Sequence, residues 1–362
     1  MADNTIKYEF KVASLRKRLL HWYDHNGRSM PWRVRSNISS NPYHVWISEI
    51  MLQQTTVNAV VPYFIRLIKK WPTVFDLAQA SLDEVLHGWQ GLGYYARARN
   101  MHQCAKTIVE SYNGVFPREI GLLKKLPGVG DYTSAAISAI AFGKPANVVD
   151  GNVERVIARL FSIKDPLPYV KTKLKDLAAG LAPKTTAGRP GDYAQALMDL
   201  GAMICTPRKP NCTACPITKY CKGSREGLAG LLPVKKTKGK KPLRKGTAFW
   251  ISSPDGEILL RKRPNSGLLG GMMEFPSTPW LEKPGFPTLI NAGLPIHGSP
   301  FTLPGSVCHT FTHFQLELNV ACLRLTENID GDKIVWCAPD LFNKYALPSV
   351  MRKIALHVTK HL

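Results

Sequence analysis

Four cysteines past the middle of the chain constrain its fold more than any other feature. They follow the spacing C-x6-C-x2-C-x5-C and are Cys205, Cys212, Cys215 and Cys221. Four thiolates this close in sequence are able to converge on one metal centre. The spacing alone leaves zinc and an iron–sulfur cluster equally open, because it contains only one C-x2-C pair. Disulfides are not expected, since the N-terminal segment has no apolar export signal.

The charge of the chain indicates what it binds. Lys and Arg number 48 against 26 Asp and Glu, which gives a net charge of +22. Such an excess favours a polyanionic partner, either a nucleic acid or an anionic membrane surface. The membrane is the weaker alternative, because the sequence has neither a basic amphipathic helix with a lipid-facing stripe nor a long apolar run. We therefore expect a nucleic-acid-binding protein with no membrane partner.

The pattern of apolar residues predicts two domains. Residues 1–223 show mainly helical spacing and end with the cysteine loop, whereas residues 246–362 change to a period of two. Between them, residues 224–245 are rich in lysine and are predicted to form an exposed basic linker. Pro254-Asp255-Gly256 between two apolar runs indicates a β-hairpin. The second domain is therefore expected to be α+β.

Local signals refine this prediction. Asn41-Pro42 indicates the start of a helix, and Ser81 with Glu84 three residues later forms a capping box. The remaining cysteines are expected to be small core residues: Cys104, Cys308, Cys322 and Cys337.

A glycine-rich turn offers a means of holding a phosphate. Residues 126–134 read LPGVGDYTS, with Gly128 and Gly130 in the turn and a helix after it. Glycines let backbone N–H groups approach an anion, and the N-terminus of the next helix adds positive charge. The alternative is a plain turn between two helices.

Two carboxylates have the properties needed to break a glycosidic bond. Glu49 lies in an almost wholly apolar helix, and burial there raises the pKa of a carboxyl toward the range of a general acid. The alternative is that Glu49 lies on a solvent-facing stripe of this helix together with Ser48 and Gln53. Asp150 precedes a periodic helix and is a natural N-cap, where backbone N–H groups stabilise the ionised form. An acid paired with an ionised carboxylate suits an oxocarbenium-like transition state.

Several motifs together resemble one family. These are the cysteine loop, WISEIMLQQT, GLGYYARARN, LPGVGDYTSAA and VVDGNVERV. Over about residues 20–222 the chain resembles the MutY family of adenine DNA glycosylases, within the endonuclease III superfamily. The resemblance implies a mainly α helix–hairpin–helix domain with a [4Fe–4S] cluster in the loop 205–221. It also implies removal of adenine mispaired with 8-oxoguanine or guanine in double-stranded DNA, with the base flipped out of the duplex.

The resemblance assigns roles by position. Glu49 matches the acid that protonates adenine N7, Asp150 matches the carboxylate that stabilises the sugar at C1′, and Tyr132 and Asn152 match residues supporting that site. Tyr132 also stands where strand-cleaving members carry a lysine, and a phenol forms no Schiff base. The matched DNA- and base-binding positions in this domain are Arg33, Gln54, Thr55, Leu92, Tyr94, Gly128 and Gly130.

The C-terminal part resembles the MutT-like, Nudix-related domain of the same family. After Gly267 it offers Glu274 but no R-E-x-x-E-E run, so no pyrophosphatase activity is expected. The family reads 8-oxoguanine through an F-S-H loop, which matches Phe311, Thr312 and His313 here, with threonine in place of serine. His309, Thr312 and His313 are therefore the expected 8-oxoguanine readers. The alternative is a strand whose alternate residues face water.

The sequence thus predicts a monofunctional, monomeric adenine DNA glycosylase in a bacterial cytoplasm, associated with the nucleoid. Its protein partners in replication or mismatch repair are left open. Three alternatives stand beside this prediction: a glycosylase of the same fold for another mismatched base, a bifunctional lyase, and a non-catalytic iron–sulfur sensor of DNA damage.

Overall fold

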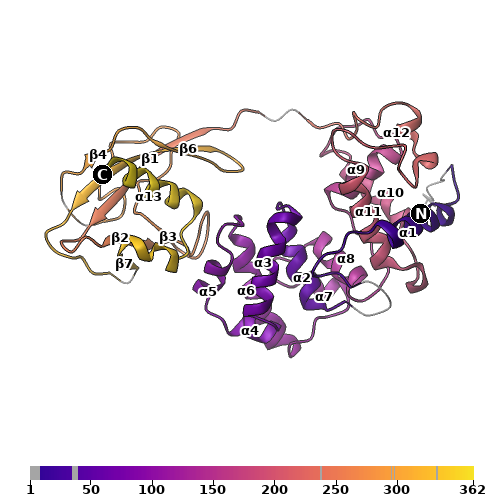
Figure 1. Cartoon of the computed structure of the whole chain (residues 1–362), viewed down its shortest axis with the longest axis horizontal. Coiled ribbons are helices and arrows are strands. Elements are labelled where there is room, and N and C mark those ends of the chain that lie inside the picture. The colour runs from indigo at the N-terminus through magenta and orange to yellow at the C-terminus, as the bar shows by residue number, and fades with distance from the viewer. Residues whose placement is uncertain (1–8, 35–39, 237–238, 295, 297, 332) are drawn as a thin grey trace. The chain divides into compact units, whose positions relative to one another are not determined.

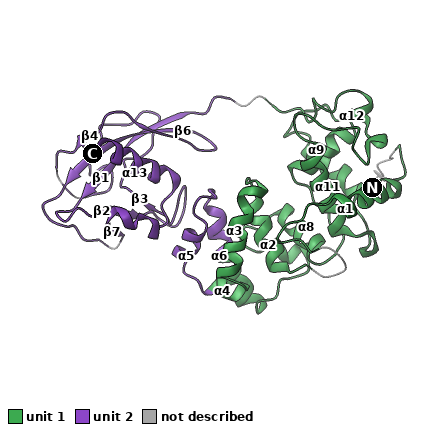
Figure 2. Cartoon of the chain, in the orientation of Figure 1, with its two compact units in different colours: residues 1–78, 103–238 green, residues 79–102, 239–362 purple. Residues whose placement is uncertain are grey.

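The computed structural model describes residues 9–34, 40–236, 239–294, 296, 298–331 and 333–362. It forms two compact units, one of residues Met1–Ala78 and Gln103–Lys238 and the other of Gln79–His102 and Gly239–Leu362 (Figure 2). The first unit is helical and the second contains the sheet. Residues 79–102, which are predicted to belong to the helical domain, are grouped with the sheet by their contacts.

Helices joined by turns and loops build the helical unit (Figure 1). They are α1 (Val12–Asn26), α2 (Pro42–Leu52), α3 (Val57–Lys70), α4 (Val74–Gln79), α6 (Ala96–Tyr112, shared with the other unit), α7 (Ile120–Leu123), α8 (Asp131–Ile140), α9 (Gly151–Leu160), α10 (Lys171–Leu181), α11 (Pro190–Met203) and α12 (Lys222–Arg225).

Helix α11 lies at the centre of this unit and packs against α1, α8 and α9. Leu19 of α1, Ile157 of α9 and Leu197 of α11 belong to one buried apolar cluster. As predicted, α2 begins at Pro42, and the side chain of Asn41 caps it by accepting a hydrogen bond from the Tyr43 N–H. Because these helices converge, residues far apart in sequence are brought to one place.

A seven-stranded sheet forms the second unit, in the order β3-β2-β1-β6-β4, with β5 also pairing with β6 and β7 with β2. The strands are β1 (Leu243–Ser252), β2 (Ile258–Lys262), β3 (Met273–Glu274), β4 (Phe301–Thr302), β5 (Val307–Thr310), β6 (Gln315–Arg324) and β7 (Ile334–Cys337). Helix α13 (Ser349–His361) packs against β5, and α5 (Leu82–Gly88) belongs to the segment 79–102. Strands β1 and β6 are parallel, with Leu243 opposite Gln315 and Ser252 opposite Arg324.

The predicted hairpin is confirmed: β1 and β2 are antiparallel around Pro254–Gly256, and Gly256 has a φ of 83°. The capping box of Ser81 and Glu84 is also present at the start of α5. No helix in the described part of the chain is long and apolar enough to cross a membrane.

One prediction holds in part and another is wrong. Most of residues 224–236 are exposed, as expected of a linker. Leu232 is buried, however, and its carbonyl accepts a 2.8 Å hydrogen bond from the Arg159 Nε. The Leu167 N–H also donates to the Val234 carbonyl at 2.9 Å. The apolar residues between the basic ones cause this packing. Cys308 is exposed, because it lies on an outward position of β5, whereas Cys104, Cys322 and Cys337 are buried as predicted.

Candidate active site and cysteine loop

A cavity of about 990 Å³ in the helical unit gathers most of the predicted site residues. Its walls come from α2, α11 and the N-terminal ends of α8 and α9. The predicted residues that line it are Glu49, Asp150, Tyr132, Asn152, Arg33, Gln54, Thr55, Gly128 and Gly130. Leu92 and Tyr94 belong to the other unit and are not among its lining residues.

Glu49 is a buried carboxyl in a buried helix. Its exposed fraction is 5%, and its helical neighbours Trp46, Ser48 and Ile50 are also buried. The solvent-facing alternative for Ser48 and Glu49 is therefore wrong. The pKa of Glu49 is raised to about 7, and burial is the largest cause. The charge of Asp150 also raises it, whereas the hydrogen bond from Tyr132 and the charge of Arg33 lower it. A carboxyl with this pKa holds its proton in part at neutral pH.

Tyr132 is hydrogen-bonded directly to Glu49. Its hydroxyl donates to the Glu49 Oε2 at 2.5 Å, and the Met198 Sδ lies 3.5 Å from the same hydroxyl. A phenol has one proton to donate, and the carboxylate oxygen is the stronger acceptor. Burial, then the charge of Glu49, raises the pKa of Tyr132 well above its ordinary value, so the phenol stays a neutral donor.

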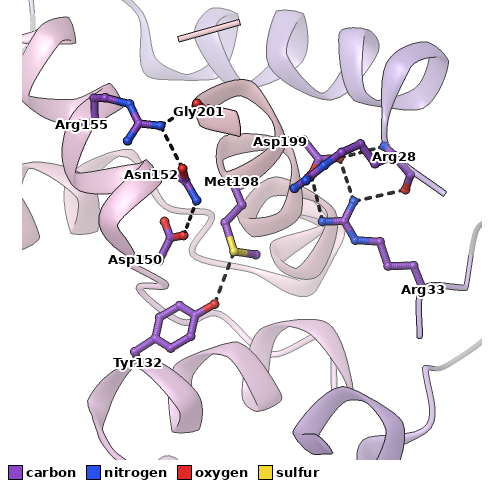
Figure 3. Close-up of polar contacts among 9 residues, drawn as sticks. All are labelled: Arg28, Arg33, Tyr132, Asp150, Asn152, Arg155, Met198, Asp199 and Gly201. Carbon is purple, nitrogen blue, oxygen red and sulfur yellow. Dashed lines mark hydrogen bonds and ion pairs between the residues drawn. The ribbon is translucent and has the colours of Figure 1, made fainter. Parts of the chain in front are cut away.

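Asp150 is held in place by donors from α9 (Figure 3). Its Oδ1 accepts from the Val153 N–H at 2.7 Å, which makes it the N-cap that the sequence predicts. Its Oδ2 accepts from the Asn152 Nδ2 at 2.7 Å. Asn152 in turn accepts from Arg155, whose Nη2 also donates to the Gly201 carbonyl. This chain of hydrogen bonds fixes the Asp150 carboxylate at the cavity.

The position of Arg33 in the cavity depends on Asp199, a residue that the sequence pattern did not predict. Asp199 of α11 is completely buried, and its two oxygens accept from the Arg33 Nη1 and Nη2 at 2.7 and 2.9 Å. The Arg28 N–H and Nε also donate to it, each at 2.8 Å (Figure 3). These arginines hold the pKa of Asp199 below its ordinary value despite burial. Charged partners lying 166 and 171 positions away leave no local pattern in the sequence.

The glycine turn precedes α8 and is open to solvent. Gly128 has a φ of 74°, a conformation that favours glycine, and Gly130 is the N-cap of the helix. Both glycines are exposed, and a Cβ built on Gly130 would meet no atom within 4 Å. The turn is therefore accessible to a phosphate.

In the sheet unit, two predicted DNA-contacting residues touch each other. The Tyr94 hydroxyl lies 3.0 Å from the Thr312 Oγ1, and both side chains are exposed. Tyr94 has a φ of 47°, which is uncommon for a residue with a side chain. His313 is exposed, whereas His309 is partly buried and its ring packs on Phe311 with centroids 4.6 Å apart. Leu92 is buried.

The four cysteines of the loop lie close enough together that Cys205, Cys212 and Cys221 act electrostatically on Cys215. Burial, with a smaller contribution from the other three thiols, raises the pKa of Cys215 to about 12. The Arg159 Nη1 donates to the Cys205 Sγ at 3.2 Å. Among the described residues, no three His, Cys, Asp or Glu side chains are arranged to hold a single ion. Four cysteines with no other ligand type are the donor set that holds iron–sulfur clusters, so these residues fit such a cluster.

Known proteins match both units. The model of the HhH-GPD superfamily of base excision DNA repair proteins matches residues 47–179, the iron–sulfur binding domain of endonuclease III matches 205–221, and the NUDIX domain matches 247–357. The adenine DNA glycosylase of Rattus norvegicus is 36% identical over 95% of this chain and 77% of that protein. The adenine DNA glycosylase of Mycolicibacterium smegmatis is 41% identical over 58% of this chain and 69% of that protein.

A solved structure agrees with the helical unit. A thermostable thymine-DNA glycosylase superposes with a TM-score of 0.53 at 32% identity, over 59% of this chain and 97% of that one.

Proposed function

The chain belongs to the family of adenine DNA glycosylases of base-excision repair, and on that premise we propose that it acts on adenine mispaired with 8-oxoguanine or guanine. It removes adenine from DNA and carries a [4Fe–4S] cluster, as its family does. The observation that carries the residue assignments is the contact of Tyr132 with a buried Glu49 in the cavity that also holds Asp150.

Glu49 supplies the proton to the leaving base. Cleavage of an N-glycosidic bond is faster when the departing base is protonated, and a carboxyl with a pKa of about 7 is matched to that task at neutral pH. Tyr132 donates to one oxygen of Glu49 and thereby orients the carboxyl. The adenine must leave the base stack to reach this cavity.

Asp150 stabilises the sugar. Its carboxylate is fixed by the Val153 N–H and the Asn152 amide, and it faces the positive charge that develops at C1′ as the base departs. Water completes the reaction and leaves an abasic site. Tyr132 offers no amine, so the enzyme is monofunctional and should not be trapped on DNA by borohydride.

Beside the two carboxylates, three features hold the DNA. The turn of Gly128 and Gly130 binds a phosphate through backbone N–H groups at the start of α8. Thr312, with Tyr94 beside it, reads 8-oxoguanine together with His309 and His313. The side chains that contact the DNA near the flipped base are Arg33, Gln54, Thr55 and Tyr94. Leu92, which was also predicted to contact the DNA, is buried and is not assigned this role.

The thiolates of Cys205, Cys212, Cys215 and Cys221 hold the cluster. Their loop presents basic side chains to the DNA, namely Arg208, Lys209, Lys219 and Lys222. The enzyme acts as a monomer. Its bacterial origin and nucleoid association stay predictions, since its relatives come from mammals, a plant and bacteria.

The identity of the released base tests this proposal. Duplexes with A opposite 8-oxoguanine, A opposite G and T opposite G are incubated with excess enzyme, and the free base is identified by mass spectrometry. Adenine should be released from the first two duplexes and fastest from the first. Release of thymine would overturn the base assignment, and tight binding without any release would support the sensor alternative.

A further inference from the structure

A second cavity, of about 580 Å³, lies in the sheet unit and is lined by an excess of positive charge. Five cationic side chains contribute to its wall: Arg244, Arg261, Lys262, Arg263 and Lys333. Glu274 is the one carboxylate among the described residues that line it. None of these residues takes part in the chemistry proposed for the helical unit.

Glu274 prearranges two of the arginines. It is 2% exposed, and its Oε1 accepts from the Arg261 Nε and Nη2 at 3.1 and 2.8 Å. Its Oε2 accepts from the Arg263 Nη1. Arg261 also donates from Nη1 to the Ala292 carbonyl, and Arg263 donates from Nε to the Leu268 carbonyl. A guanidinium has five N–H groups, so these contacts use three on Arg261 and two on Arg263. The remaining donors are held on guanidinium groups whose orientation is fixed.

Charge in this cavity is not balanced. Glu274 neutralises one arginine, and Asp83 neutralises Lys262 through a 2.7 Å ion pair. Five cations less these two anions leave three positive charges around one concave surface. Fixed guanidinium donors with surplus charge are the arrangement that recognises phosphate oxygens.

Aromatic rings lie beside these cations. The Arg263 guanidinium lies 5.6 Å from the ring centre of Trp280, which also lines the cavity. The Arg244 guanidinium lies 4.5 Å from the ring centre of Phe314. Because Glu274 is buried and already paired with two arginines, it is not available to hold the magnesium ions of a pyrophosphatase. The cavity is therefore equipped to bind a phosphate compound without hydrolysing it.

The geometry points to a phosphate-binding site in this cavity, formed by Arg261, Arg263 and Lys333. Two sources supply that chemistry: a free nucleoside polyphosphate, or the phosphodiester backbone of the DNA substrate. The site is separate from the adenine cavity and does not depend on the assignments made there.

Calorimetric titration of the full, cluster-loaded chain with inorganic tripolyphosphate, with EDTA present, tests the inference. Arg263→Gln keeps Glu274 paired with Arg261 and should weaken binding about tenfold or more, because charge-assisted hydrogen bonds are strong. Lys333→Gln, at an exposed residue, should weaken it about twofold to fivefold. Lys283→Gln removes the same charge at an exposed residue outside the cavity and should leave the affinity unchanged. Thermal unfolding of each variant checks that it is folded.

Two further titrations separate the sources. If the ligand is a free nucleotide, dATP binds, duplex DNA does not displace it, and Arg263→Gln binds DNA as Lys283→Gln does. If the ligand is the DNA backbone, duplex DNA displaces tripolyphosphate, and Arg263→Gln lowers both DNA affinity and its salt dependence relative to that control. Absence of tripolyphosphate binding, or equal binding by Arg263→Gln and Lys283→Gln, overturns the inference. Adenine release reports on the cavity of the helical unit, so it is measured separately and does not test phosphate binding in the sheet unit.

Discussion

Replacing Glu49 with glutamine should stabilise the protein as the pH rises. Glu49 is buried in an apolar helix, so its charged form is disfavoured in the folded state. Its pKa is raised from 4.5 to about 7, and the folded state therefore retains a proton that the unfolded state releases. Below the unfolded pKa both states are protonated and the penalty is absent. Above the folded pKa the penalty is complete, and glutamine does not incur it.

The size of the stability gain follows from the pKa shift of Glu49. A change from 4.5 to about 7 corresponds to about 3 kcal/mol of unfolding free energy at high pH. Most of this, about 2 to 3 kcal/mol, develops between about pH 5 and about pH 8 by the same linkage. The Glu49→Gln variant should therefore gain that much stability over the wild type on going from the lower to the higher pH.

Guanidinium unfolding of both proteins at the two pH values measures the gain. Both carry the cluster, so its contribution cancels in the difference between them. Glu110→Gln, at an exposed position of α6, is the matched control and should show no pH-dependent gain. If the difference between Glu49→Gln and the wild type is the same at both pH values, Glu49 is ionised without penalty and the reasoning is refuted.

Three other predictions concern the neighbours of this carboxyl and the DNA contacts. Tyr132→Phe removes the hydrogen bond that lowers the pKa of Glu49, so the fall of adenine release with pH should move to higher pH in single-turnover profiles; an unmoved profile would count against the contact. Asp199→Asn removes the charge between Arg28 and Arg33 and should cost about 3 kcal/mol or more in denaturant unfolding, because it leaves the buried Arg33 without its carboxylate; a variant as stable as the wild type would contradict this. Thr312→Ala should reduce the preference for A opposite 8-oxoguanine over A opposite G in paired single-turnover rates, and an unchanged ratio would mean that Thr312 is not a reader.

Local sequence signals predicted much of the fold. The capping box at Ser81, the cap at Asn41 and the hairpin around Gly256 depend on residues a few positions apart, and all three are present. The burial of Glu49 followed from the apolar run around it. Each of these features is decided by its immediate neighbours in the chain.

Features that depend on distant partners were not predicted. Asp199 meets Arg33 only because α11 packs at the centre of the helical unit, 166 positions later in the sequence. Leu232 is buried and its carbonyl is bonded to Arg159 of α9, although lysines follow it closely in the sequence. Cys308 is exposed because it lies on the solvent-facing side of β5, and the amino-acid composition does not reveal which side that is. In each case tertiary packing decides the environment.

Single-turnover adenine release from a duplex with A opposite 8-oxoguanine, by wild type, Glu49→Gln and Glu110→Gln, tests the central claim most directly. Removing a general acid costs about a hundredfold or more in rate. We expect Glu49→Gln to bind the duplex as tightly as the wild type and to lose adenine release by at least that factor, while Glu110→Gln keeps the wild-type rate. Adenine release by Glu49→Gln at the wild-type rate would contradict the assignment of Glu49 as the acid.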